Sequence, residues 1–204
     1  MLIWLSALVI AVTTAARQIP SERESRTIFP LLAKPIARWQ VLVGKFLGCW
    51  LATGIALLVF YVFFALVSAS KEHVLPVGAY FEAMWMHWQM LGIVIALTLL
   101  GSVVLSMAAN VTLVFIISVG ILMMGGFLHL LAGRMTEPSA TLLTAVYFMI
   151  PHLELFNLNE LIIHDWAMAP DMWLDVLLTT VYGLAYTAFF LVAACLVFRR
   201  KALN

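Results

Sequence analysis

The chain has 204 residues, of which 65% are apolar and 10% charged, and its mean hydropathy is +1.08. Soluble domains are about half apolar and about a quarter charged, so this composition excludes a soluble protein and indicates one embedded in a bilayer. The net charge of +1 gives no basic surplus that would indicate a nucleic-acid partner, and at about 20 residues a crossing the chain has room for about five or six spans.

Five apolar runs are predicted to cross the bilayer. The first is short, so the alternative of a further helix upstream of it stays open. No Asp, Glu, Lys or Arg occurs between Glu82 and Arg134, a stretch too long for one helix, and Asn110 near its middle is the expected tight turn. We predict an all-α fold, a polytopic helical membrane protein with a single transmembrane domain over residues 1–204. The predicted spans are residues 1–16, 46–67, 89–109, 111–131 and 173–198.

Charge predicts which segments face the cytoplasm. Residues 17–45 and the tail 199–201 hold nine of the eleven Lys and Arg residues. Under the positive-inside rule, this loop and the C-terminus are both cytoplasmic. Five spans then place the N-terminus outside, whereas an upstream sixth helix would bring it inside.

Two other segments are expected on the outer side. Residues 68–82 form a polar link, and Trp85 and Trp88 after it are expected at the membrane interface. Residues 133–172 hold five of the ten Asp and Glu residues and two of the five histidines. They form an extracytoplasmic amphipathic segment before the last span, lying at the membrane surface or dipping partly into it. Its helical period runs through Leu153, Phe156, Leu158, Leu161 and Ile162.

The basic loop over residues 17–45 also contains apolar residues. Ser21 and Glu24 have the spacing of a capping box, which predicts a short helix, and Pro30 and Pro35 divide the rest of the loop into short pieces. A cytoplasmic loop with apolar residues beside Arg and Lys lies on anionic lipid or docks into a partner protein. The apolar residues concerned are Ile28, Phe29, Leu31, Leu32, Ile36 and Trp39.

The same loop carries an ordered set of short motifs, namely Glu24, Arg26-Thr27, Leu31-Leu32, Lys34-Pro35, Arg38 and Gly44-Lys45. Their order resembles the signature loop of the ABC type-2 permeases, and the rest of the chain resembles the multicopper-enzyme-maturation branch of that family. The resemblance implies the permease subunit of an ATP-driven exporter in a bacterial cytoplasmic (inner) membrane. The implied partners are a cytoplasmic ABC ATPase subunit, a second copy of the permease or a homologous permease, and the lipid bilayer.

On this resemblance the loop is a coupling segment that seats in a groove of the ATPase. Glu24 and Arg26 form its charged rim. The implied apolar plug is Thr27, Ile28, Phe29, Leu31 and Leu32. The implied elbow back into the membrane is Pro35, Arg38, Gly44 and Lys45.

The sequence contains no phosphate-binding loop. Such a loop needs G-x-x-x-x-G-K-[ST], whereas the chain's only Gly-Lys pair, Gly44-Lys45, is followed by Phe46 and lacks the upstream glycine. We therefore expect no catalytic residue and no cofactor in this chain, with ATP and Mg on the partner ATPase. An intramembrane hydrolase is disfavoured, because the sequence has no H-E-x-x-H motif and the polar residues of the spans lack an acidic partner.

Several patterns have two interpretations. The eleven methionines, with Met123-Met124 among them, are interpreted as packing residues, and copper binding is the alternative. His129 is interpreted as bonded to a neighbour rather than as a transport ligand. An outer cluster is interpreted as solvated, with a metal site as the alternative; it comprises His152, Glu154, Glu160, His164 and Asp165.

Small residues also have two interpretations. Gly125-Gly126 indicates close packing or a hinge. A stripe at four-residue spacing indicates packing within the chain, with a dimer face as the alternative; it comprises Gly44, Gly48, Ala52 and Ala56. For the whole chain, the alternative function is a non-transporting membrane anchor or adaptor, for an ATPase or for the maturation of another protein complex. The sequence leaves the substrate open.

Overall fold

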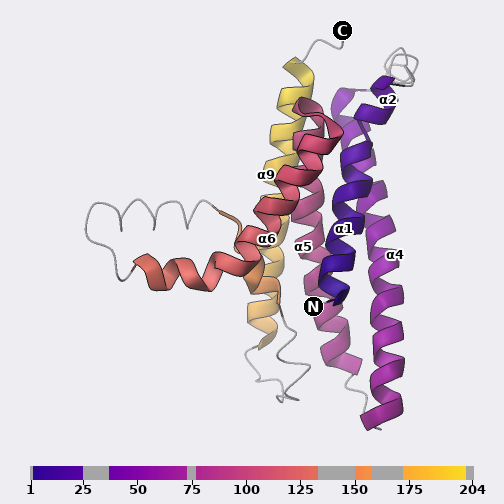
Figure 1. The fold of residues 1–204 in the computed structure, drawn as a ribbon, viewed down its shortest axis with the longest axis vertical. Helices are drawn as coiled ribbons and strands as arrows, with labels where there is room; N and C mark the ends of the chain where they lie inside the picture. Colours follow the sequence, from indigo (N-terminus) through magenta and orange to yellow (C-terminus); the bar gives the residue numbers. More distant parts are fainter. Residues whose placement is uncertain (1, 25–36, 73–76, 133–149, 158–171, 201–204) are drawn as a thin grey trace.

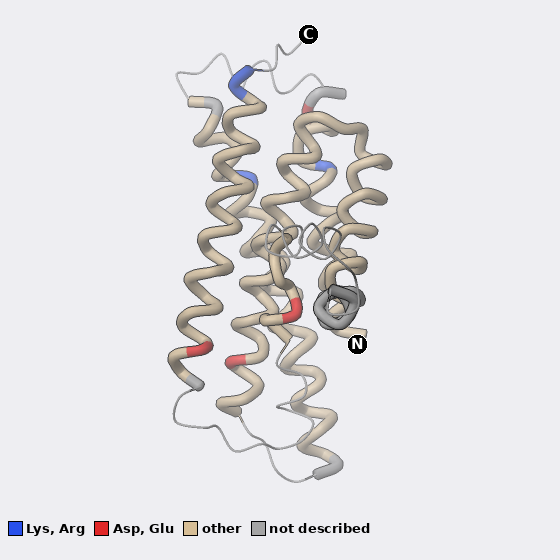
Figure 2. Tube along the Cα trace, turned by 90° about the vertical axis from the view of Figure 1, so that its left-hand side faces the viewer, with Lys and Arg blue, Asp and Glu red and all other residues tan. Residues whose placement is uncertain are grey.

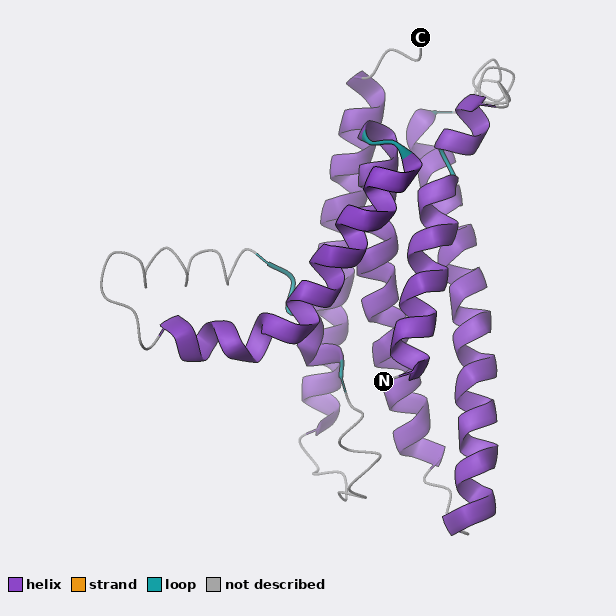
Figure 3. Cartoon of the chain, viewed as in Figure 1, coloured by secondary structure: helices purple, strands orange, loops and turns teal. Residues whose placement is uncertain are grey.

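The computed structural model describes residues 2–24, 37–72, 77–132, 150–157 and 172–200, and these residues are helical or connecting, with no strand among them. Figure 3 shows long helices running side by side, which confirms the predicted all-α polytopic fold. Two elements are short, α2 (Pro20–Glu24) and the 3-10 helix η1 (Leu153–Phe156). The long helices are α1 (Leu2–Arg17), α4 (Arg38–Glu72), α5 (Val77–Val104), α6 (Met107–Ala132) and α9 (Met172–Arg200).

Four stretches of the described residues are long and apolar enough to cross a membrane. They are Leu2–Glu22, Trp39–Ser70, Val77–Val104 and Trp173–Arg200. The shorter apolar stretch Met107–Leu122 belongs to α6, which corresponds to the remaining predicted span. This helix starts alongside the others and then turns away from the bundle (Figure 1). Gly125-Gly126, for which the sequence predicts close packing or a hinge, lie in α6, whose helix continues through them.

Helix α5 forms the centre of the bundle. It contacts α1, α4, α6, α9 and η1, and in Figure 1 it lies between α6 and α9 on one side and α1 and α4 on the other. In its most apolar stretch 72% of the residues are buried, against 17–39% in the other three spans. A helix that is apolar around its whole circumference is typically buried in this way. The outer faces of α4 and α9 remain apolar and exposed, as surfaces that meet lipid do.

The tight turn between α5 and α6 lies at Leu105–Ser106, so the prediction of a turn at Asn110 is wrong. Ser106 starts α6 because its hydroxyl accepts a hydrogen bond from the Ala109 amide at 3.4 Å. Asn110 is fully buried inside α6, and its Nδ2 donates to the Thr98 carbonyl of α5 at 2.9 Å. The amide therefore ties two helices together instead of forming the turn.

The outer link is also shorter than predicted, because α4 continues through Glu72 and α5 begins at Val77. A helix can extend beyond its apolar stretch, because its backbone hydrogen bonds form whether or not the side chains are apolar. Trp85 and Trp88 consequently lie inside helix α5, where both side chains are half-buried against neighbouring helices, and their place at the membrane interface stays a prediction. The Trp85 indole donates to Thr180 Oγ1 of α9 at 3.1 Å, which satisfies its N–H without water.

Two tryptophans lock α4 against α5. The rings of Trp50 and Trp88 stack with centroids 4.3 Å apart. Each indole N–H donates to the other tryptophan's carbonyl, Trp50 to Trp88 at 3.2 Å and Trp88 to Trp50 at 2.9 Å. Gly54 and Gly92, each one turn after a tryptophan, leave room for the opposite ring, because a Cβ at Gly54 would lie 2.7 Å from Trp88. The crossing thus uses the same W-x-x-x-G pattern on both helices.

Candidate functional site at the base of the basic loop

The coupling residues predicted from the sequence fall into two groups. Glu24 ends α2, Arg38 begins α4, and Gly44 and Lys45 lie inside α4. The others, which are the whole plug, one of the two rim residues and the first elbow residue, lie in residues 25–36, outside the described residues, and the coupling roles of both groups stay predictions. The residues of this second group are Arg26, Thr27, Ile28, Phe29, Leu31, Leu32 and Pro35.

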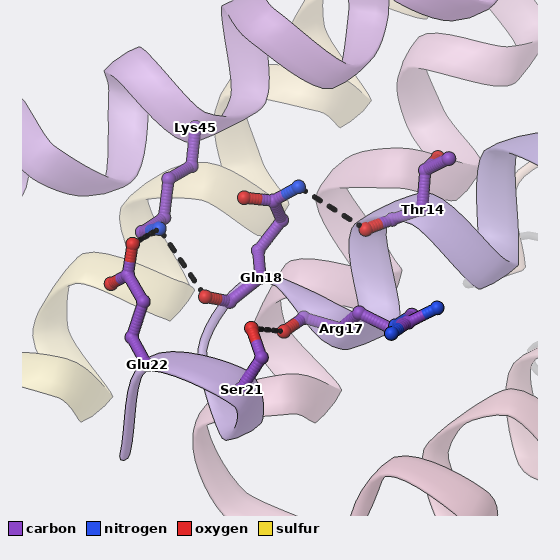
Figure 4. Close-up of polar contacts among 6 residues, drawn as sticks. All are labelled: Thr14, Arg17, Gln18, Ser21, Glu22 and Lys45. Carbon is purple, nitrogen blue, oxygen red and sulfur yellow. Dashed lines mark hydrogen bonds and ion pairs between the residues drawn. The ribbon is translucent and has the colours of Figure 1, made fainter. Parts of the chain in front are cut away.

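The short helix predicted near Ser21 is present as α2. It begins at Pro20, a residue suited to the first turn of a helix because it has no N–H to satisfy. The Ser21 hydroxyl donates to the Arg17 carbonyl at 2.5 Å, so the serine joins α2 to the end of α1 (Figure 4). The predicted helix is therefore confirmed, and the Ser21 hydroxyl bonds a carbonyl at the end of α1.

Helix α4 begins at Arg38, inside the predicted elbow and before its Gly44-Lys45 pair. The Gln40 side chain accepts a hydrogen bond from the Ala37 amide at 3.0 Å, which is half of a capping box at the start of the helix. Gly44 and Lys45 therefore lie about two turns inside α4 rather than at its first residues.

Lys45 joins the two helices that flank the loop. Its Nζ donates to the Gln18 carbonyl at 3.2 Å and pairs with Glu22 Oε1 at 2.5 Å (Figure 4). The side chains of Lys45 and Glu22 are 12% and 26% exposed, so both charges are mostly shielded from water. Gln18 directly follows α1, where carbonyls have no partner within the helix. Lys45 thus contacts that carbonyl and one oxygen of a carboxylate of α2 at once.

A pocket of about 480 Å³ opens beside Lys45. Gly44 and Gly48 lie on its wall and are exposed, and no atom of another described element lies within 4 Å of a Cβ built on either glycine. The interpretation that this part of the small-residue stripe packs within the chain is therefore wrong for the described residues. The alternative, a dimer face, stays a prediction. The lining residues are Gln18, Gln40, Val41, Gly44, Lys45, Gly48 and Cys49.

Charge divides the molecule along its length. In Figure 2 the Lys and Arg positions drawn in blue lie in the half that carries the end of α9, and the Asp and Glu positions drawn in red, apart from one, lie in the other half. Among described side chains the basic ones are Arg17, Lys45, Arg199 and Arg200, and the acidic ones are Glu22, Glu82, Glu154 and Asp175. The basic end is the end that holds the candidate site.

The sequence analysis missed a polar group in the centre of the bundle. His87 on α5 is fully buried and stacks on Trp4 of α1, with ring centroids 4.6 Å apart. Its Nδ1 lies 3.5 Å from the Tyr61 hydroxyl, and its Nε2 has no hydrogen-bond partner among the described residues. The available signal was an ionisable residue in a stretch free of Asp, Glu, Lys and Arg. An ionisable residue at this depth is a candidate for function.

The outer segment is held by α9 where the structure describes it. The His152 amide donates to the Tyr182 hydroxyl at 2.9 Å, and Leu153 and Phe156 are buried against the bundle. The described part is thus amphipathic, with Leu153 and Phe156 packed against the bundle and Leu155 exposed. Its place relative to the membrane surface stays a prediction. Glu160, His164 and Asp165 lie outside the described residues, as does the side chain of His129, and the described part of the chain holds no group of three metal-binding side chains.

The comparisons with known proteins give one match. The family model for ABC-2 family transporter proteins matches residues 3–203, almost the whole chain. The chain belongs to the ABC-2 transporter family. Comparisons with curated proteins and with solved structures found no match. The family resemblance predicted from the basic loop is confirmed, and the match does not distinguish the multicopper-maturation branch.

Membership of the ABC-2 family indicates the general role of the chain. An ABC-2 protein is the membrane permease component of an ABC transporter, and members of the family have no ATPase site of their own. This agrees with the absence of a phosphate-binding loop from the sequence. Family membership also implies an ABC ATPase partner, and with the apolar helices it indicates a multi-pass membrane protein.

Proposed function

We propose that this ABC-2 permease is the membrane subunit of an exporter whose ATPase docks on the loop over residues 17–45. The observation that carries the proposal is the Lys45 contact with Gln18 and Glu22, which joins both flanks of that loop. A loop anchored on both sides can pass a displacement to the helices behind it, whereas a loose lipid anchor needs no such link.

The charge distribution supports the orientation in this proposal. The described Lys and Arg residues gather at the end that carries the loop and the C-terminus (Figure 2). By the positive-inside rule this end faces the cytoplasm, where ATP and the ATPase are available. In a bacterium the membrane concerned is the cytoplasmic (inner) membrane. Two permeases and two ATPases form the proposed working unit, with the path for the substrate between the permeases.

Docking is tested by affinity purification from the native membranes in mild detergent. Phe29→Asp places a charge in the apolar plug, and Val77→Asp makes the same change at an exposed position at the start of α5, away from the loop. We expect an ATPase to co-purify with the wild type and with Val77→Asp, and to be lost with Phe29→Asp. Retention of the ATPase by Phe29→Asp, or its absence from the wild type, contradicts the docking proposal.

A second candidate function is a non-transporting anchor or adaptor, favoured by the same docking loop. The two functions differ in what the bound ATPase does. Reconstitution of the complex into vesicles distinguishes them, because a transporter moves a lipid or drug-like solute across the bilayer and changes its ATP turnover with that substrate. An adaptor binds the ATPase and leaves solute distribution unchanged.

A further inference from the structure

The Lys45–Glu22 contact joins parts of the chain that the loop separates. Glu22 lies in α2, in the first part of the loop over residues 17–45, and Lys45 is the last residue of that loop and lies in α4. It is the one salt bridge among the described side chains. Lys45 also holds the carbonyl that follows α1, so one ammonium group connects three helices.

The burial of this pair makes it sensitive to loss of either partner. Removing one member of a shielded ion pair leaves the other charge without compensation, which is strongly unfavourable. An exposed pair contributes little, because water and salt screen it. With 12% and 26% of their side chains exposed, Lys45 and Glu22 are closer to the buried case.

The helices joined by Lys45 also meet in the centre of the bundle. Helices α1 and α4 both pack on α5, and α4 is locked to it by the Trp50–Trp88 crossing. Helix α2 has only five residues, too few to hold a position without contacts to longer helices. Its serine joins it to α1 and its glutamate joins it to α4.

We infer that Lys45 and Glu22 are positioning residues that make α1, α2 and α4 move as one unit when the loop is displaced. The inference rests on the proposed function, since it assumes an ATPase on that loop. Without the pair, the ATPase still binds through the plug, but its motion shifts α2 without shifting α4. ATPase binding and the effect of the permease on ATP turnover then become separable.

The test compares four variants of the full chain, purified with the ATPase. Lys45→Met removes the charge at similar length, and Glu22→Gln removes the opposite charge while leaving the lysine bond to Gln18. Lys45→Arg keeps both donor contacts, and Arg199→Met removes an exposed charge at the same end of the molecule. Three quantities are measured, namely the amount of ATPase bound, the change in ATP turnover caused by the permease, and hydrogen exchange of the α2 amides.

Lys45→Met and Glu22→Gln are expected to bind the ATPase at the wild-type level and to reduce the permease-dependent change in turnover by about ten-fold, within the usual range of coupling between sites. Their α2 amides exchange faster, whereas Lys45→Arg and Arg199→Met resemble the wild type. Wild-type coupling in Glu22→Gln overturns the inference, and that variant decides the matter if Lys45→Met aggregates. Loss of ATPase binding in Glu22→Gln overturns it as well, because the pair then acts in docking. Absence of an ATPase from the wild type instead contradicts the proposed function. In that case, unchanged hydrogen exchange of the α2 amides in Lys45→Met and Glu22→Gln still rejects the positioning role of the pair.

Discussion

The sharpest test of the fold is Gly54→Ala at the tryptophan crossing. The added Cβ would lie 2.7 Å from Cε2 and Nε1 of Trp88, and ordinary contact begins at 3.4 Å, so the ring must move by about 0.7 Å to restore ordinary contact. The ring is held by its stack on Trp50 and by its hydrogen bond to the Trp50 carbonyl. Overpacking a well-packed core costs about 1–3 kcal/mol, which is the size of effect we expect.

Gly44→Ala is the matched control on the same helix. Both substitutions favour the helix by up to about 1 kcal/mol, because alanine has the higher helix propensity. At Gly44 the described structure leaves the new methyl group open space. The difference between the two variants therefore isolates the clash, with Gly54→Ala less stable than Gly44→Ala by about 1–3 kcal/mol.

The assay is reversible unfolding in detergent, monitored by near-ultraviolet circular dichroism, which also reports the stacked indoles. Gly54→Ala should lower the free energy of unfolding relative to Gly44→Ala and weaken the signal of the tryptophan pair. Equal stability of the two variants would refute the reasoning, since it would mean that the Trp88 ring moves freely and does not lock α4 to α5.

Two further substitutions test the polar contacts inside the bundle by the same assay. Gly101→Ala should destabilise the protein by about 1–3 kcal/mol, because its Cβ would lie 2.0 Å from Asn110 Oδ1. Adding Asn110→Ala should restore part of this loss of stability. Strictly additive effects of the two substitutions would contradict the contact. His87→Phe should stabilise the fold by about 1 kcal/mol, because it removes a buried nitrogen without a described partner and keeps a ring on Trp4. A loss of stability in His87→Phe would contradict this expectation, and would mean that the contact with Tyr61 or a bond at Nε2 outweighs the cost of burying the imidazole.

The position of α5 explains how one loop could influence the whole bundle. This helix touches all the long helices of the described structure, and the two that flank the loop, α1 and α4, pack directly on it. A displacement of α1 and α4 must therefore change contacts made by α5 with α6 and α9 or move α5 with them. His87 lies where α1, α4 and α5 meet, through its contacts with Trp4 and Tyr61, so it is the first intramembrane position at which to look for an effect on transport.

The sequence alone determined the class of the protein, its helices and its candidate docking loop. Long apolar stretches with few charges must be helical in a bilayer, because the backbone finds no other hydrogen-bond partners there. The concentration of Lys and Arg in residues 17–45 and 199–201 marked one end of the molecule, and the order of residues in the loop pointed to the family that the comparison confirmed.

The tertiary structure decided which side chains meet. An apolar helix such as α5 shows no single hydrophobic face, so its sequence does not indicate which neighbours it contacts. Asn110 stands near the middle of the charge-free stretch and so predicts a turn there, whereas in the structure it bonds to Thr98 across the helix pair. The Lys45–Glu22 pair depends on where α2 and α4 are placed in space, which spacing along the chain does not fix. Hydropathy and backbone hydrogen bonding along the chain determine where the helices form, whereas packing in three dimensions determines which side chains meet.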